Sequence, residues 1–334
     1  MRRLLLVLTV LANSALAESR NSIERQQQAV LTVQRNAAES LAKQSKGLVN
    51  SLQGYCHAQK SIELARQQWT HVMSAWMRLQ GQQRGPDLAI ERYWQVQFYP
   101  DKKDTTGRKM RHLREHSSAW SVEELADQSV AVQGVGAIEW LLFDESSWLS
   151  HSEIDCQNGV AITQSLNKNT DWIAKQWQAY TFDSMDEQVW ASVYLALINS
   201  QLDYAMKKMS LMLGKPGKSK PYFAEAWRSQ TSVGFIKTNL QAVSDLYLAS
   251  GQGLDSHLRG RGESELADKV SLSLGYLIST WPANVKEHEM LNDKSGYQEL
   301  LGLYNQISYV HYLLTEPVAQ SLGVVVGFNS TDGD

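Results

Sequence analysis

The segment IELARQQWTHVMSAWMRL, residues 62–79, carries a regular amphipathic pattern. Its apolar residues recur at alternating spacings of three and four positions: Ile62, Ala65, Trp69, Val72, Trp76 and Leu79. This period matches the turn of an α-helix, so one face of the segment would be apolar along its whole length. The segment therefore predicts a long helix with one buried face.

The same period recurs along most of the chain. Comparable patterns occupy residues 23–55, 153–180, 194–212, 233–249, 263–281 and 300–318. Only six prolines occur in 334 residues, and GKPGKSKP at 214–221 is a clear loop. The sequence predicts an all-α fold of two consecutive helical bundles, residues 18–183 and 184–334, with four long helices in each.

A less regular stretch separates the second long helix from residue 121. It contains Gly85-Pro86 and Tyr99-Pro100, which predict short helices and loops. The following SVEE, residues 121–124, is a capping-box sequence that marks a helix N-terminus. We expect a single helix to begin there and to continue through residues 130–143.

The first 17 residues, MRRLLLVLTVLANSALA, have the three parts of a secretory signal peptide. Two arginines precede a short apolar core, and a small-residue cleavage site follows it. The core is too short to span a bilayer, and no later stretch is long and apolar enough to do so. We expect an exported protein of the periplasm or cell envelope without a transmembrane span.

Charge and cysteine content narrow the class of protein further. Removing the first 17 residues lowers the Lys and Arg count from 32 to 30, against 35 Asp and Glu, so a nucleic-acid partner is not indicated. The two cysteines, Cys56 and Cys156, are expected to form a disulfide in an oxidising compartment, which is favoured over a thiolate metal site. Eleven tryptophans are explained better by helix packing than by a sugar-stacking platform.

One acidic residue lies in an otherwise apolar run, VAVQGVGAIEWLLF, residues 130–143. The helical neighbours of Glu139 are Val135, Gly136, Leu142 and Phe143, so its carboxylate is expected to be buried. A buried carboxylate needs a cation, several hydrogen-bond donors or a metal. Two interpretations stay open, namely a structural acid paired with an arginine and a ligand site.

Both interpretations place the same candidate residues around Glu139. The candidate cations are Arg66 and Arg78, and Trp69 or Trp76 could donate an indole N–H to the carboxylate. Gly136 would leave space beside the acid, and Gly134 would admit a neighbouring helix.

A second motif, HLREH at residues 112–116, matches the H-x-x-E-H pattern of zinc peptidases. In that pattern His112 and His116 would bind the metal and Glu115 would act as the base. Arg108, Lys109 and further cations surround it, which favours the alternative of a solvated basic helix.

Several motifs together resemble the imelysin-like proteins, bacterial exported proteins associated with iron regulation and uptake. They run in order along the mature chain: the W-x6-W-x-R pattern of Trp69, Trp76 and Arg78, GPD at 85–87, FYPD at 98–101, QGVGAIEWLLF at 133–143 and GFNSTDGD at 327–334. The resemblance implies an all-α envelope protein of two bundles, in a family named for an insulin-cleaving peptidase.

The hallmark of that family is G-x-H-x-x-E, whose His and Glu could face one metal. Here Gly134 and Glu139 match, but Gly136 stands at the His position, as in a His-lacking branch. We expect a binding or accessory protein of iron or other divalent metal acquisition, with a pocket around Glu139 and envelope iron-uptake or redox proteins as partners. Glu139 is the metal-ligand candidate of this interpretation, and a zinc peptidase that uses His112, Glu115 and His116 is the competing one.

Overall fold

The computed structural model describes residues 2–115, 118–283 and 285–324, with side chains from residue 21 onward. No strand is formed anywhere in these ranges, and the ordered segments are helices of widely different length. The all-α prediction is therefore confirmed. No helix in the same ranges is both long enough and apolar enough to cross a membrane.

Three long helices dominate the first half of the chain. They are α1 (Arg2–Cys56), α2 (Ile62–Met77) and α8 (Glu153–Ala179). The stretch between α2 and α8 forms short elements: α3 (Asp87–Ile90), α4 (Tyr93–Val96), α5 (Thr105–Leu113), α6 (Val122–Ala126), the 3-10 turn η1 (Val130–Val132) and α7 (Val135–Phe143).

Four long helices form the second half, as predicted. They are α9 (Glu187–Leu213), α10 (Ser232–Leu248), α12 (Ser264–Thr280) and α14 (Lys294–Leu313). The shorter elements are η2 (Pro221–Phe223), η3 (Ala249–Gly251), α11 (Leu254–Gly260), α13 (Glu287–Asn292), the π-helical η4 (Leu314–Val318) and α15 (Ala319–Leu322).

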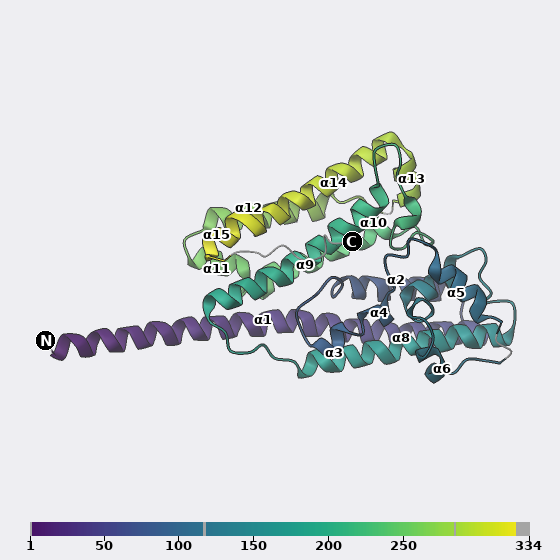
Figure 1. Ribbon diagram of the computed structural model, residues 1–334, viewed down its shortest axis with the longest axis horizontal. Helices are drawn as coiled ribbons and strands as arrows, with labels where there is room; N and C mark the ends of the chain where they lie inside the picture. The colour runs from purple at the N-terminus through teal and green to yellow at the C-terminus, as the bar shows by residue number, and fades with distance from the viewer. Residues whose placement is uncertain (1, 116–117, 284, 325–334) are drawn as a thin grey trace.

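The long helices form two layers (Figure 1). Helices α1, α2 and α8 lie together on one side, and α9, α10, α12 and α14 lie together on the other. Each layer has its own apolar core, but Val30 of α1 packs into the second core and Phe235 of α10 into the first. The boundary at residue 183 stays a prediction, since the two cores exchange side chains across it.

The prediction of one helix running from Ser121 through residues 130–143 is wrong. The capping box is present, because Ser121 and Glu124 bind each other's backbone N–H, yet α6 ends after five residues at Ala126. Helix α7 begins separately after Gly134, whose backbone is extended. The first half therefore has three long helices and a nine-residue α7, because the apolar run is interrupted by a polar turn that the periodicity did not register.

The tryptophans confirm the packing interpretation for most of their number. Those that are nearly inaccessible to solvent are Trp69, Trp76, Trp140, Trp148, Trp177, Trp190 and Trp281. Trp120 and Trp227 are partly buried, and Trp94 and Trp172 are exposed, with 53% and 38% of their surface accessible.

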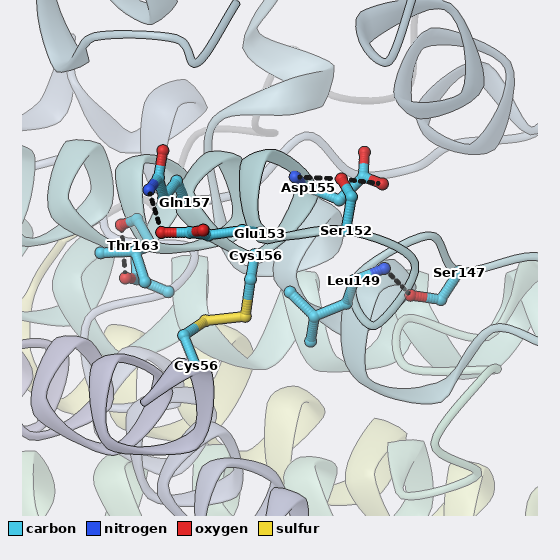
Figure 2. The surroundings of a disulfide bond; sticks show 10 residues. Cys56, Ser147, Leu149, Ser152, Glu153, Asp155, Cys156, Gln157 and Thr163 are labelled. Carbon is cyan, nitrogen blue, oxygen red and sulfur yellow. Dashed lines mark hydrogen bonds between the residues drawn. A yellow bond between two sulfur atoms is a disulfide. The ribbon is translucent and has the colours of Figure 1, made fainter. Parts of the chain in front are cut away.

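The disulfide is formed as predicted. Cys56 at the end of α1 is bonded to Cys156 in the first turns of α8, and the two Cα atoms are 5.8 Å apart. Figure 2 shows the bond bridging the two helices beside Leu149 and the Ser152 cap of α8. It fixes the far end of α1 against α8, along which α1 packs.

Candidate functional site

Glu139 lies in the junction between the two layers. It is carried by α7, and 2% of its surface is exposed. Its Oε1 accepts two hydrogen bonds of 2.9 Å from Ser229, one from the backbone N–H and one from the hydroxyl. Ser229 belongs to the segment between η2 and α10, residues 224–231, which we call the junction loop.

The two glycines of the α7 motif have different roles. A Cβ at Gly134 would overlap the backbone carbonyl of Val96 at the end of α4, so only glycine allows this approach. A Cβ at Gly136 would have no atom within 4 Å, so the face of α7 one turn before Glu139 is open. The predicted close approach at Gly134 is thus confirmed, although the partner is a carbonyl at a helix end.

Burial dominates the electrostatics of Glu139. It raises the pKa of the carboxyl from 4.5 to about 7, although the Ser229 N–H, the positive charge of Arg228 and the Ser229 hydroxyl favour the ionised form. The carboxyl group therefore changes protonation near neutral pH.

Arg228, next to Ser229 in the junction loop, is a cation whose charge acts on Glu139. Its guanidinium is 5% exposed and binds Asp144 at 2.7 Å and Asp104 at 2.6 Å. It also lies 4.2 Å from the centre of the Trp227 ring. The guanidinium of Arg228 thus binds other carboxylates, and Arg228 favours the ionised form of Glu139 through its charge and through a backbone hydrogen bond.

A second buried acid, Glu287, comes to the same loop from the opposite layer. It is the first residue of α13, has no exposed surface, and accepts a 3.0 Å hydrogen bond from the Ser232 hydroxyl at the start of α10. Its Oε2 has no hydrogen-bond partner among the described residues. Burial, strengthened by the charge of Glu139, raises the pKa of Glu287 to about 8.

A buried ion pair holds the start of the junction loop. Lys208 of α9 donates to Glu225 at 2.7 Å and to Gln80 at 2.7 Å, and all three side chains are buried. Burial lowers the pKa of Lys208, and the Glu225 carboxylate opposes this effect. The loop that binds Glu139 is therefore fixed by contacts to α9 and to the segment after α2.

The four partners predicted for Glu139 bind elsewhere. Arg66 donates to the carbonyl of Leu142 at 2.8 Å and pairs with Glu63, and Arg78 pairs with Asp245. The indole N–H groups also have other acceptors, since Trp69 donates to the carbonyl of Val135 and Trp76 to Gln97. These expectations are wrong because the partners of Glu139 come from the junction loop.

The HLREH motif does not form a buried site. His112 and Glu115 bind each other at 2.8 Å with side chains 72% and 71% exposed. Helix α5 ends at Leu113, so the motif continues past the helix, and His116 lies outside the described residues.

Sequence reasoning missed Ser229, Arg228 and Glu287. The first two lie in an irregular loop, and Glu287 lies beside HEMLN, residues 288–292, where a metal-binding pattern is incomplete. The spacing of apolar residues along the sequence does not indicate that these residues would contact α7.

The donors around Glu139 do not make a complete metal shell. In the part of the chain that the structure describes, no group of three or more His, Cys, Asp or Glu is placed to hold a metal ion. The side chains nearest the carboxylate offer hydroxyl and carboxylate oxygens. A resident metal held by protein ligands alone does not fit these residues.

Comparison with known proteins agrees with this architecture. The family model for imelysin, which carries the label peptidase M75, matches residues 33–314. An imelysin-like protein from Psychrobacter arcticum 273-4 superposes with a TM-score of 0.78 at 22% identity, covering 93% of this chain and 98% of the other.

A second solved structure is described as a "putative iron-regulated protein A precursor" from Parabacteroides distasonis ATCC 8503. It has a TM-score of 0.64 at 14% identity and covers 87% of this chain and 94% of its own. At these identities the two structures establish a shared fold. No curated protein matches the sequence.

Proposed function

Because the chain belongs to the imelysin family, we propose that it is an exported binding or accessory protein of iron or other metal acquisition, with its ligand pocket around Glu139. The observation that carries the proposal is a buried carboxylate beside open space. Glu139 is held by Ser229, and the face of α7 at Gly136 is unfilled. A carboxylate in this setting is available to a ligand that brings positive charge or hydrogen-bond donors.

The metal would arrive with most of its own ligands. Glu139 and the hydroxyl oxygens of the junction loop are hard donors, which suit iron in its hydrated or chelated forms better than a thiophilic metal. The related structure described as an iron-regulated protein precursor supports this assignment. Envelope iron-uptake or redox proteins are the partners that this role implies.

The signal-peptide pattern of the first 17 residues supports export to the periplasm or cell envelope. A disulfide between Cys56 and Cys156 is compatible with an oxidising compartment. Amino-terminal sequencing of the protein recovered from a periplasmic fraction tests this proposal, with Glu18 as the expected first residue.

Titration calorimetry with ferric citrate, ferrous iron and zinc tests the binding site. We expect saturable binding of an iron species and a loss of at least about tenfold in affinity for Glu139→Gln, since losing even a residue that only supports a metal ligand typically costs that much. Glu289→Gln is the matched control, because Glu289 is exposed and lies two residues from Glu287. Iron binding that is unchanged in Glu139→Gln would remove the site from the proposal.

The same purified protein is used to distinguish a zinc peptidase from a binding protein. Wild-type protein and His112→Ala are incubated with casein and insulin, and zinc content is measured for both. Stoichiometric zinc together with cleavage that is lost in His112→Ala would favour a zinc peptidase over a binding protein.

A further inference from the structure

A pocket of about 310 Å³ opens beside α5, away from the Glu139 site. Helices α5 and α6 lie near the same end of α8 (Figure 1), and η1 follows α6. The pocket is lined by residues of α5, of η1 and of the turns that follow α5 and α6: Lys109, His112, Leu113, Glu115, Trp120, Gln128, Ser129 and Val132. Neither Glu139 nor the junction loop contributes to it.

Unused hydrogen-bond donors predominate in this lining. The ammonium group of Lys109 and the side-chain amide of Gln128 form no hydrogen bond or ion pair with any described residue. His112 binds Glu115 through Nδ1, and its Nε2, which has no described partner, is a further donor when the ring is protonated. The hydroxyl of Ser129 accepts from the N–H of Ala131 and keeps its own proton to donate.

The one acidic group of the lining already has a partner. Glu115 binds Nδ1 of His112 at 2.8 Å, so its negative charge is balanced when His112 is protonated. Lys109 then supplies an unmatched positive charge. A ligand that satisfies these groups must bring acceptor oxygens and negative charge.

The floor of the pocket is apolar and fixed. Leu113 and Val132 are 5% and 1% exposed, so they are anchored in the first core. The indole N–H of Trp120 donates to the carbonyl of Leu113 at 3.0 Å, which orients the ring at the pocket. An apolar ring on the ligand would be in contact with these side chains, as is common in small-molecule sites.

Basic residues gather on α5 beside the pocket. Arg108, Lys109, Arg111 and Arg114 are exposed on or just after α5, in a protein whose acidic residues outnumber its lysines and arginines. Arg111 and Arg114 are paired with Asp104 and Asp155, whereas Lys109 is unpaired among the described residues. Glu123, Glu124 and Asp127 are exposed in and just after α6, so the attraction of an anion to the pocket rests on Lys109 itself.

From this arrangement we infer that the α5 pocket binds a small organic anion, a carboxylate or phosphate group attached to a flat apolar ring. Lys109 and His112 bind the anionic group, Gln128 and Ser129 donate further hydrogen bonds, and the ring lies against Leu113, Val132 and Trp120. The basic residues of HLREH thus serve anion binding. This assignment does not depend on the function of Glu139.

Four probes with the same ring and different charge test the inference. Benzoate, phenyl phosphate, benzyl alcohol and benzylamine are titrated into the full-length protein at low ionic strength, with binding followed by ligand-observed NMR and calorimetry. We expect one or both anions to saturate the site, and the ratio of their affinities to show whether carboxylate or phosphate is preferred. Benzyl alcohol and benzylamine should bind at least tenfold more weakly.

Two lysine variants separate the pocket from general charge attraction. Lys109→Ala should weaken anion binding about tenfold, the value of one charge-assisted hydrogen bond. Lys103→Ala is the matched control, because Lys103 is exposed in the segment before α5 and does not line the pocket. Circular dichroism confirms that both variants fold, which is expected because both side chains are exposed.

Three results would overturn the inference. The first is no saturable binding of either anion up to about 10 mM, the weak end of specific binding. The second is equal affinity for benzylamine. The third is an equal loss of affinity in Lys109→Ala and Lys103→Ala, which would assign the effect to diffuse surface charge.

Discussion

Replacing Glu139 by glutamine should change the pH dependence of stability more than the fold itself. The glutamine side chain has nearly the same shape, and its carbonyl oxygen can accept both hydrogen bonds from Ser229. The replacement removes a carboxyl group that gains or loses a proton with pH and puts a neutral amide in its place. The free energy of unfolding of the wild type and of Glu139→Gln should therefore differ by an amount that depends on pH.

The sign follows from the direction of the pKa shift. Burial raises the pKa of Glu139 in the folded protein from 4.5 to about 7, so the folded state holds a proton that the unfolded state has released between these values. The wild type is then fully stabilised by this group below pH 4.5, loses that contribution as pH rises, and has lost it above pH 7.

The magnitude is an order-of-magnitude figure. Each pKa unit corresponds to about 1.4 kcal/mol, so the shift of Glu139 is worth about 3 kcal/mol between roughly pH 4.5 and 8. Coupling to Glu287 divides this amount between the two acids. We expect Glu139→Gln to be more stable than the wild type at about pH 8 by about 1 to 3 kcal/mol, relative to their difference at about pH 4.5.

Urea unfolding at pH 4.5, 6 and 8, followed by tryptophan fluorescence and circular dichroism, measures the difference. Glu289→Gln is the control, because its exposed carboxylate should leave the curve parallel to that of the wild type. The reasoning is refuted if Glu139→Gln loses about 3 kcal/mol or more at pH 8, since that result would mean an ionised Glu139 directly paired with a cation.

Three further perturbations address the glycines, the ion pair and the disulfide. Gly134→Ala should destabilise the protein by about 1 to 3 kcal/mol through backbone overlap, whereas Gly136→Ala should be neutral or stabilise it by up to about 1 kcal/mol; thermal unfolding compares the two. Lys208→Met should cost about 3 to 5 kcal/mol by stranding a buried carboxylate, and adding Glu225→Gln should recover part of that loss in urea unfolding. Reducing the disulfide, which spans 100 residues, should lower the free energy of unfolding by up to about 4 to 5 kcal/mol in the chain-entropy description. Urea unfolding with and without reductant measures this loss. Equal unfolding midpoints in the two conditions would contradict the prediction.

The local spacing of apolar residues was sufficient to predict where the long helices lie. The three-four spacing in residues 62–79 predicted α2, and equivalent patterns predicted α1, α8, α9, α10, α12 and α14. Such spacing determines which face of a helix is apolar, so it also predicted that Glu139 would be buried. The pairing of Cys56 with Cys156 was equally accessible, because only two cysteines are present.

Local pattern failed where the chain turns. The apolar run containing Glu139 looked continuous with the capping box at Ser121, but the chain ends α6 and begins α7 afresh at Gly134. At this break the end of α4 packs against the Gly134 backbone, a contact that the pattern of the segment itself does not predict.

The composition of the site was decided by tertiary structure alone. Ser229 is 90 residues from Glu139, and Glu287 comes from another helix in the opposite layer. The periodicity of one helix contains no information about which distant loop packs against it, so the sequence predicted a partner for Glu139 and supplied the wrong arginines. Burial of Glu139 was a property of its helix face, whereas the partners of that carboxylate depend on how α7, the junction loop and α13 pack together.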